Sequence, residues 1–216
     1  MVYDLISEIK KLGDELVKCN RKCDGIAVNR NNGILPRCLI LKTEKVNQSG
    51  CAIIGINPGL SGPREQAYYK EAYKKKENLY KTEIDYWEKE ISRRKYYKRL
   101  NELVGKFSDF GLILWTELVK CENADKEKQV PLQTFRCCTQ QYLRREIKLL
   151  NTDWPLFAVG KRCYEALSFL YTEKTIIGIP HPTGSRGHFD KMNNKPLPVG
   201  LLKLLSGKAV WLPDII

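Results

Sequence analysis

Two short loops carry the side chains best suited to chemistry. The first is residues 55–59 (Gly-Ile-Asn-Pro-Gly), and the second is residues 181–187 (His-Pro-Thr-Gly-Ser-Arg-Gly). The amide of Asn57 can hold a water molecule in place, although it is not a strong base. A neutral imidazole at His181 can donate a hydrogen bond to an oxygen on which negative charge develops. With no metal motif in either loop, this pair fits a reaction whose difficult step is to stabilise a leaving-group anion.

Both loops also have a plainer explanation. Asn-Pro-Gly is a common turn sequence. His181 is one of only two histidines and stands between Pro180 and Pro182, where it can be buried and bonded to backbone. The functional interpretation therefore requires that the two loops lie together, which depends on the elements that carry them.

Buried strands are predicted directly before both loops. The apolar run 51–56 stops at the first loop, and the run 175–179 stops at the second. Two further strands of the sheet are expected at 112–116 and 156–159, and a short strand at 37–41 is not counted among these four. Helices are expected at 1–18, over most of 64–106, and at 131–150, 161–170 and 197–206. This alternation predicts an α/β fold, a three-layer α/β/α sandwich with a central, mainly parallel four-stranded sheet. Ligands of such sheets bind beyond the carboxyl ends of the strands, so we expect the two loops to converge on one cleft.

Length and charge limit the classes of protein to which the chain can belong. The 216 residues fit a single domain, 1–216, with a basic, Tyr-rich helical segment at about 64–106. That segment holds 13 basic and 8 acidic side chains, and the net charge of the chain is +12. A positive field attracts phosphates, so a nucleic-acid partner and a solvated helix face are equally good explanations of the charge. No apolar run reaches the roughly 18 residues of a membrane span, so we expect a cytoplasmic monomer that binds no membrane.

The two loops also resemble the motifs of a known family. Residues 55–60 resemble the water-positioning motif of the uracil-DNA glycosylase superfamily, as found in its mismatch-specific and single-strand-selective branches. Residues 181–186 resemble its second motif, which continues into the loop that wedges into DNA. Residues 115–121 and 138–143 resemble the iron–sulfur-containing branch, and residues 159–167 extend that match. The resemblance covers roughly residues 19–60 and 110–190.

The resemblance implies a monofunctional DNA glycosylase, which rotates a pyrimidine-type nucleotide out of the stack and hydrolyses its bond to the sugar. His181 would stabilise the base anion, and Asn57 would orient the attacking water. No lysine nucleophile is implied, so we expect an abasic site without strand cleavage. The remaining implied contacts are to the base, from Gly55, Ile56, Pro58, Gly59 and Glu117, and to DNA, from Thr183, Gly184, Ser185 and Arg186.

Two departures from the family bear on which base is removed. Gly59 and Leu60 occupy a stretch where classical uracil enzymes carry a tyrosine that blocks ring carbon 5. Glu117 stands where related enzymes usually carry an asparagine that reads the pairing edge. An ionised carboxylate accepts well from the amino group of cytosine. This favours a 5-substituted cytosine, as in phage DNA, and a role in antiviral defence.

Other interpretations stay open at this point. The enzyme can be an ordinary repair glycosylase for uracil or mismatched thymine, with Glu117 only orienting a neighbouring group. The chain can also be a catalytically silent DNA-binding module. A nucleotide-binding enzyme is disfavoured, because no glycine-rich phosphate loop is present. Lys120 and His188 are interpreted as polar surface residues.

Four of the eight cysteines resemble the ligands of a structural 4Fe–4S cluster: Cys19, Cys23, Cys121 and Cys138. The first two are separated by three residues where the branch has two, and Cys137 competes with Cys138. Zinc would suit four thiolates as well, and free buried thiols are the third alternative. Cys51 and Cys163 lie in apolar stretches and are expected in the core.

Overall fold

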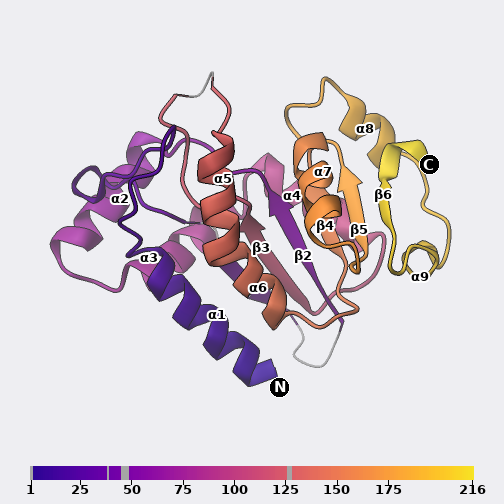
Figure 1. Ribbon diagram of the computed structural model, residues 1–216, viewed down its shortest axis with the longest axis horizontal. Helices are drawn as coiled ribbons and strands as arrows, with labels where there is room; N and C mark the ends of the chain where they lie inside the picture. The colour runs from indigo at the N-terminus through magenta and orange to yellow at the C-terminus, as the bar shows by residue number, and fades with distance from the viewer. Residues whose placement is uncertain (1, 38, 45–48, 126–127) are drawn as a thin grey trace. The chain divides into compact units, whose positions relative to one another are not determined.

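The computed structural model describes residues 2–37, 39–44, 49–125 and 128–216 (Figure 1). Cys38 lies outside the described residues, as do two positions of the predicted polar loop 122–129. The chain divides into two compact units. The first unit comprises residues 1–40, 57–90 and 116–150, and the second comprises residues 41–56, 91–115 and 151–216. The prediction of a single domain stays a prediction.

The sheet belongs mainly to the second unit. Parallel pairing joins β2 (Gly50–Gly55) to β4 (Leu156–Val159), β4 to β5 (Ile176–Ile179), and β5 to β6 (Ala209–Trp211). The full order is β1-β3-β2-β4-β5-β6, with β1 (Leu39–Thr43) and β3 (Leu112–Glu117) each crossing the boundary between the units. The mainly parallel α/β fold is confirmed, but the sheet has six strands where four were predicted. The strand β6 was missed because three half-exposed residues carry too little apolar pattern.

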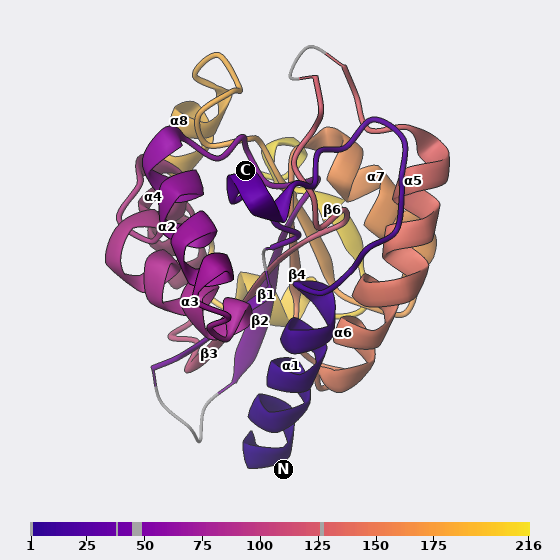
Figure 2. The ribbon, with the colours of Figure 1, turned by 90° about the vertical axis from the view of Figure 1, so that its left-hand side faces the viewer.

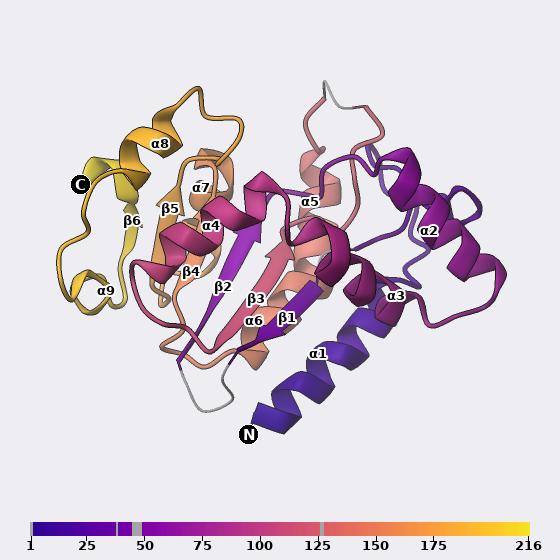
Figure 3. The same ribbon diagram turned by 180° about the vertical axis from the view of Figure 1, so that it is seen from behind.

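Helices cover both faces of this sheet within the second unit, as the three-layer prediction requires. Figure 1 shows α7 (Lys161–Leu170) on one face, and Figure 3 shows α4 (Lys95–Gly105) on the other. Tyr164 of α7 packs against Trp211 of β6, with ring centroids 5.5 Å apart. A Cβ at Gly178 would lie 2.4 Å from the Trp211 ring, so glycine is required beneath this pair. The short helices α8 (His188–Asn193) and α9 (Leu201–Leu204) connect β5 to β6.

Helices dominate the first unit. The helix α1 (Val2–Leu16) packs against α3 (Leu79–Tyr86) and against α6 (Arg144–Leu149), and Figure 2 shows α1 beside α6. A Cβ at Gly13 would lie 2.2 Å from the Tyr80 ring, so glycine allows the close approach of α1 to α3. The Tyr80 hydroxyl donates to the carbonyl oxygen of Leu39 (2.6 Å), and its burial raises the pKa of Tyr80. The helix α2 (Pro63–Lys74) precedes α3.

One continuous helical run carries Cys137 and Cys138. The helix α5 (Leu132–Cys138), a π-helical turn (Thr139–Leu143) and α6 follow one another without a break after Pro131. This confirms the helix predicted at 131–150. The π-helical turn begins directly after Cys138, and such turns are frequent at functional sites. Among the described residues, no helix is long and apolar enough to cross a membrane.

Candidate active site

The amide of Asn57 is held by three acceptors of the first unit. Asn57 comes two residues after β2 and is half-buried. Its Nδ2 donates to Oδ1 of Asn123 (3.1 Å) and lies 3.3 Å and 3.5 Å from the carbonyl oxygens of Pro58 and Cys121. Because all three partners accept, the amide nitrogen must face them and Oδ1 of Asn57 is turned away from them. A fixed amide with its acceptor oxygen directed elsewhere can orient a water molecule.

A buried ion pair fastens the rest of the first loop. Oε2 of Glu122 accepts from the backbone N–H of Ser61 (2.6 Å) and from the Arg37 guanidinium (3.2 Å). Arg37 also donates to the carbonyl oxygen of Gly59. Both charged side chains are almost fully buried, and breaking such a pair leaves an uncompensated charge. Sequence reasoning missed this pair, although a glutamate shortly after a buried strand is a signal that could have found Glu122.

Glu117 is the last residue of β3, and its carboxyl group is buried in the first unit. The residue is 7% exposed, and its Oε2 has no hydrogen-bond partner among the residues that the structure describes. Burial raises the pKa of Glu117 to about 8, although the charges of Lys120 and Arg37 act in the opposite direction. The carboxyl group is therefore mainly protonated at neutral pH. The preference for an amino group that follows from an ionised carboxylate does not apply to this neutral form.

Lys120 is buried, so its interpretation as a surface residue is wrong. It is 1% exposed, and its Nζ donates to Oγ1 of Thr116, to the carbonyl oxygen of Glu117 (2.6 Å) and to Oε2 of Glu146 (2.8 Å). Its ionic partner comes 26 residues later on another element, which local pattern does not reveal. His188 is exposed, as expected.

The imidazole of His181 is fixed by the backbone that follows it, in the second unit. Its Nδ1 lies 3.0 Å from the backbone nitrogen of Gly184 and 3.3 Å from that of Thr183. Since backbone N–H groups only donate, Nδ1 is the acceptor, and the proton of the neutral ring is on Nε2. Although solvent reaches part of the residue, the surrounding protein desolvates the ring and lowers the pKa of His181. The side chain therefore presents an Nε2–H donor at neutral pH.

Two residues of α4 hold this loop, and sequence reasoning missed both. The Tyr96 ring lies against the His181 ring, with centroids 5.2 Å apart. Arg99 donates to the carbonyl oxygen of Pro182, pairs with Asp190 of α8, and lies 4.7 Å from the centre of the Phe189 ring. Arg99 contacts residues that come more than 80 positions later in the sequence, so no local pattern could have indicated these contacts.

The second loop continues into an exposed turn that leads to α8. Arg186 has a φ of 49°, and Gly187 has a φ of 86°. The left-handed region is unfavourable for arginine, and such residues cluster at functional sites. The hydroxyl of Ser185 accepts from the backbone N–H of Phe189 (3.0 Å), so the turn is anchored at its far end. The arrangement leaves Arg186 exposed to a partner.

The predicted site residues are distributed over both units. Asn57, Pro58, Gly59 and Glu117 belong to the first, whereas Gly55, Ile56, His181 and residues 183–186 belong to the second. The thiol of Cys163 donates to the carbonyl oxygen of Ile54 (3.1 Å) near the end of β2, and Cys51 and Cys163 are core residues, as predicted. The convergence of the two loops on one cleft stays a prediction.

Comparison with known protein families shows to which family the chain belongs. A sequence model of the uracil DNA glycosylase superfamily matches residues 43–199. The chain belongs to the uracil-DNA glycosylase superfamily. Members of this superfamily are DNA glycosylases, hydrolases that act on N-glycosyl bonds in DNA. A search of curated proteins finds no match to the chain.

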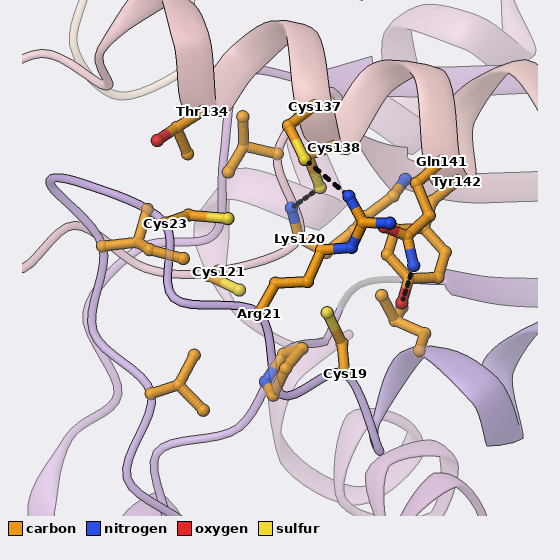
Figure 4. Close-up of a pocket in the computed structure, with 15 residues that line it drawn as sticks. Cys19, Arg21, Cys23, Lys120, Cys121, Thr134, Cys137, Cys138, Gln141 and Tyr142 are labelled. Atoms are coloured by element: carbon orange, nitrogen blue, oxygen red, sulfur yellow. Dashed lines mark hydrogen bonds between the residues drawn. The ribbon is translucent and has the colours of Figure 1, made fainter.

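A pocket in the first unit gathers five cysteines of this superfamily member. Cys19 and Cys23 come from the loop after α1, Cys121 from the segment after β3, and Cys137 and Cys138 from the end of α5. Figure 4 shows their sulfur atoms directed toward a common space in the first unit. Burial raises the pKa of Cys138 to about 11 and also raises the pKa of Cys121. Among the described residues, no three potential ligands are close enough to hold a single metal ion.

The two adjacent cysteines of this pocket have different partners. The electrostatic partners of Cys121 include Cys138, Cys19 and Cys23. Cys138 also accepts the backbone N–H of Lys120 (3.3 Å). Cys137 instead accepts from the Arg21 guanidinium (3.1 Å), as Figure 4 shows. Cys137 also interacts with Cys23, so both Cys137 and Cys138 stay candidate ligands.

The Tyr-rich segment of this glycosylase-like chain is largely helical, as predicted. Tyr69 and Tyr86 are buried and lie 5.5 Å apart between ring centroids, and Tyr80 is buried as well. Tyr68 and Tyr73 are exposed. Core packing therefore accounts for several of the tyrosines, and the exposed ones remain available to a partner.

Proposed function

We propose that the chain is a monofunctional DNA glycosylase that hydrolytically releases a pyrimidine-type base and leaves an abasic site. The observation that carries the proposal is the fixed imidazole of His181 in a member of this superfamily. With Nδ1 occupied by the N–H groups of Thr183 and Gly184, Nε2–H is the end that can donate to a ligand. A neutral donor is suited to a carbonyl oxygen that gains negative charge.

In this reaction, the target nucleotide leaves the stack, and the bond between the base nitrogen and sugar carbon C1′ lengthens. The base departs with the bonding electrons, and its carbonyl oxygen takes the hydrogen bond from His181 Nε2. A water molecule adds its oxygen to C1′, and the released proton neutralises the base. We assign the orientation of this water to Oδ1 of Asn57, because three acceptors hold the amide nitrogen in place.

We assign DNA contacts to the turn at residues 183–186. Arg186 is exposed in a left-handed conformation at the tip of that turn, and Ser185 anchors it to α8. An exposed arginine on a rigid turn is suited to phosphate contact or to filling the gap left by the rotated nucleotide. The net charge of +12 adds an attraction that does not depend on sequence.

We further propose that the substrates are pyrimidines that carry a substituent on ring carbon 5, with modified cytosines of phage DNA as the first candidates. A Cβ built at Gly59 meets no described atom within 4 Å, and Leu60 is 51% exposed. The first loop thus lacks the bulk that would exclude such a substituent. Excision of modified bases from invading DNA would make the protein a defence enzyme. A repair enzyme for uracil or mismatched thymine is the second candidate, because neutral Glu117 can donate to the carbonyl oxygen on carbon 4 of those bases.

We also propose that Cys19, Cys23, Cys121 and Cys138 hold a structural 4Fe–4S cluster. Each thiolate of such a cluster binds a different iron, so the sulfurs stand farther apart than the four sulfurs around one zinc ion, each about 2.3 Å from it. A cluster therefore needs room between its thiolates, and these four cysteines line one pocket. The cluster would tie the loop after α1 to α5 and take no part in bond cleavage.

The test is a substrate panel. The purified protein is incubated with DNAs that contain uracil, mismatched thymine, 5-methylcytosine or bulkier 5-substituted cytosines, and released bases are identified by mass spectrometry. Release of the 5-substituted cytosines supports the proposal in full, and release of uracil or thymine alone supports the repair enzyme. A protein that binds these DNAs and releases no base is a silent binding module.

A further inference from the structure

We infer that Glu117 selects the base as a neutral carboxylic acid, donating one hydrogen bond and accepting another at the pairing edge of the pyrimidine. The inference rests on the proposed function. It deepens that function, because it defines the substrates by the edge that they present and makes their recognition depend on pH.

The first support is a count of buried charges. Five carboxyl groups and two cations are buried in the first unit: Glu65, Glu83, Glu117, Glu122, Glu146, Arg37 and Lys120. Arg37 pairs with Glu122 (3.2 Å) and Glu65 (3.4 Å), and Lys120 pairs with Glu146 (2.8 Å). Glu117 forms no ion pair with any residue that the structure describes. With five acids and two bases buried in one unit, the excess of negative charge is relieved most readily by protonating an acid that lacks an ion pair.

The second support is that Lys120 has no donor left for the Glu117 carboxyl. An ammonium group has three N–H donors. They go to Oγ1 of Thr116, the carbonyl oxygen of Glu117 and Oε2 of Glu146. Lys120 thus holds the backbone at the end of β3, but it donates no hydrogen bond to the carboxyl group of Glu117.

The third support is the state of the carboxyl group itself. Its Oε2 is buried and has no hydrogen-bond partner among the described residues. A buried polar atom left unsatisfied costs about 1–3 kcal/mol, and more if it is charged, so a ligand is expected to satisfy it. Protonation removes the charge, and the burial that raises the pKa of Glu117 to about 8 keeps it protonated at neutral pH.

A neutral carboxyl group places an O–H donor beside a C=O acceptor. Cytosine presents an acceptor at ring nitrogen 3 and a donor at its amino group, and the acid matches both. Uracil and thymine present the opposite pair, which the acid matches with its proton on the other oxygen. The ionised form only accepts, and it leaves one of the two groups of either base opposed by a lone pair. The substrate class is therefore a pyrimidine with an unblocked pairing edge, and a methyl group on nitrogen 3 should prevent its release.

The experiment compares the unmodified protein with Glu117→Gln, whose amide keeps a donor and an acceptor and cannot ionise. Single-turnover base release is measured from pH 6 to pH 10 on the best substrate of the panel. The unmodified protein should lose about tenfold in rate per pH unit above about pH 8, as expected when one group must be protonated. The rate of Glu117→Gln should change less than twofold over the same range. Glu173→Gln, an exposed control, should reproduce the loss.

A second measurement needs no activity. In infrared difference spectra between pH 7 and pH 9.5, the unmodified protein should lose the C=O band of a buried protonated carboxyl, and Glu117→Gln should lack that band at both pH values. A missing band in the unmodified protein overturns the inference, as does a parallel loss of rate in Glu117→Gln. If no DNA yields a base with any variant, the proposed function fails, and the band still decides the state of Glu117.

Discussion

Nδ1 of His181 lies 3.0 Å from the backbone nitrogen of Gly184, three residues along the same turn, and accepts its hydrogen bond. The contact fixes both the orientation of the ring and the position of its proton. It depends on glycine, because a Cβ at position 184 would lie 3.1 Å from Nδ1. The turn to which we assign DNA contacts is thus the same element that orients the imidazole.

Replacing Gly184 should therefore slow base release. In Gly184→Ala the methyl group displaces the ring by a few tenths of an ångström, and we expect a roughly tenfold fall in single-turnover rate with little change in DNA affinity. Gly105→Ala is the control, since its Cβ meets no described atom within 4 Å. Equal rates for the two variants would show that the contact with Gly184 does not position the imidazole.

The lowered pKa of His181 predicts a loss of activity and stability in acid. Burial lowers the pKa below the ordinary value of 6.5, so the folded protein binds fewer protons there than the unfolded chain between those two values. Stability from this group is present above pH 6.5 and is lost as pH falls through the folded-state pKa. A proton on Nδ1 would also face the backbone N–H groups of Thr183 and Gly184, from which the neutral ring accepts hydrogen bonds. Thermal unfolding and base release, both followed from pH 7.5 to pH 4.5, should decline together, and His181→Gln should remove this contribution to the thermal profile.

Arg99 should act as a positioning residue for the second loop. It connects α4 to the carbonyl oxygen of Pro182 and to Asp190. We expect Arg99→Met to lower the single-turnover rate about tenfold or more while DNA affinity changes less than threefold, and Arg99→Lys to recover part of the rate. Arg145→Met serves as the control, because Arg145 pairs with Glu15 on the surface. A loss of DNA affinity that accounts for the whole effect would contradict the assignment.

The two adjacent cysteines should differ in their contribution to the cluster. Cys138 is more deeply placed and accepts the backbone N–H of Lys120, whereas Cys137 is bonded to the exposed Arg21 and also interacts with Cys23. Iron and sulfide, measured chemically on protein purified without oxygen, should be lost in Cys138→Ser and kept in Cys137→Ser. The opposite result would make Cys137 the ligand in place of Cys138. If the unmodified protein contains no iron, the cluster proposal fails, and bound zinc or free thiols are the remaining explanations of the cysteine pocket.

The sequence predicted the elements that local pattern specifies. The strands before Asn57 and His181 are continuous apolar runs closed by proline and glycine, so their ends and their loops could be located. The sequence did not predict what depends on distant partners. Lys120 is buried only because Glu146 arrives from another helix, and Arg99 contacts a loop more than 80 residues away. The protonation of Glu117 likewise follows from its burial and from ion pairs that leave it out, neither of which is visible in the spacing of residues.

The central claim is that Asn57 serves the hydrolysis of a base from DNA, and Asn57→Ala tests it most directly. Base release and DNA affinity are measured side by side for this variant and for the unmodified protein on the same modified-cytosine DNA. The account predicts that the unmodified protein releases free base and leaves an abasic site, and that Asn57→Ala loses about 100-fold or more in rate with nearly unchanged affinity. Equal rates of release for the two proteins would contradict it.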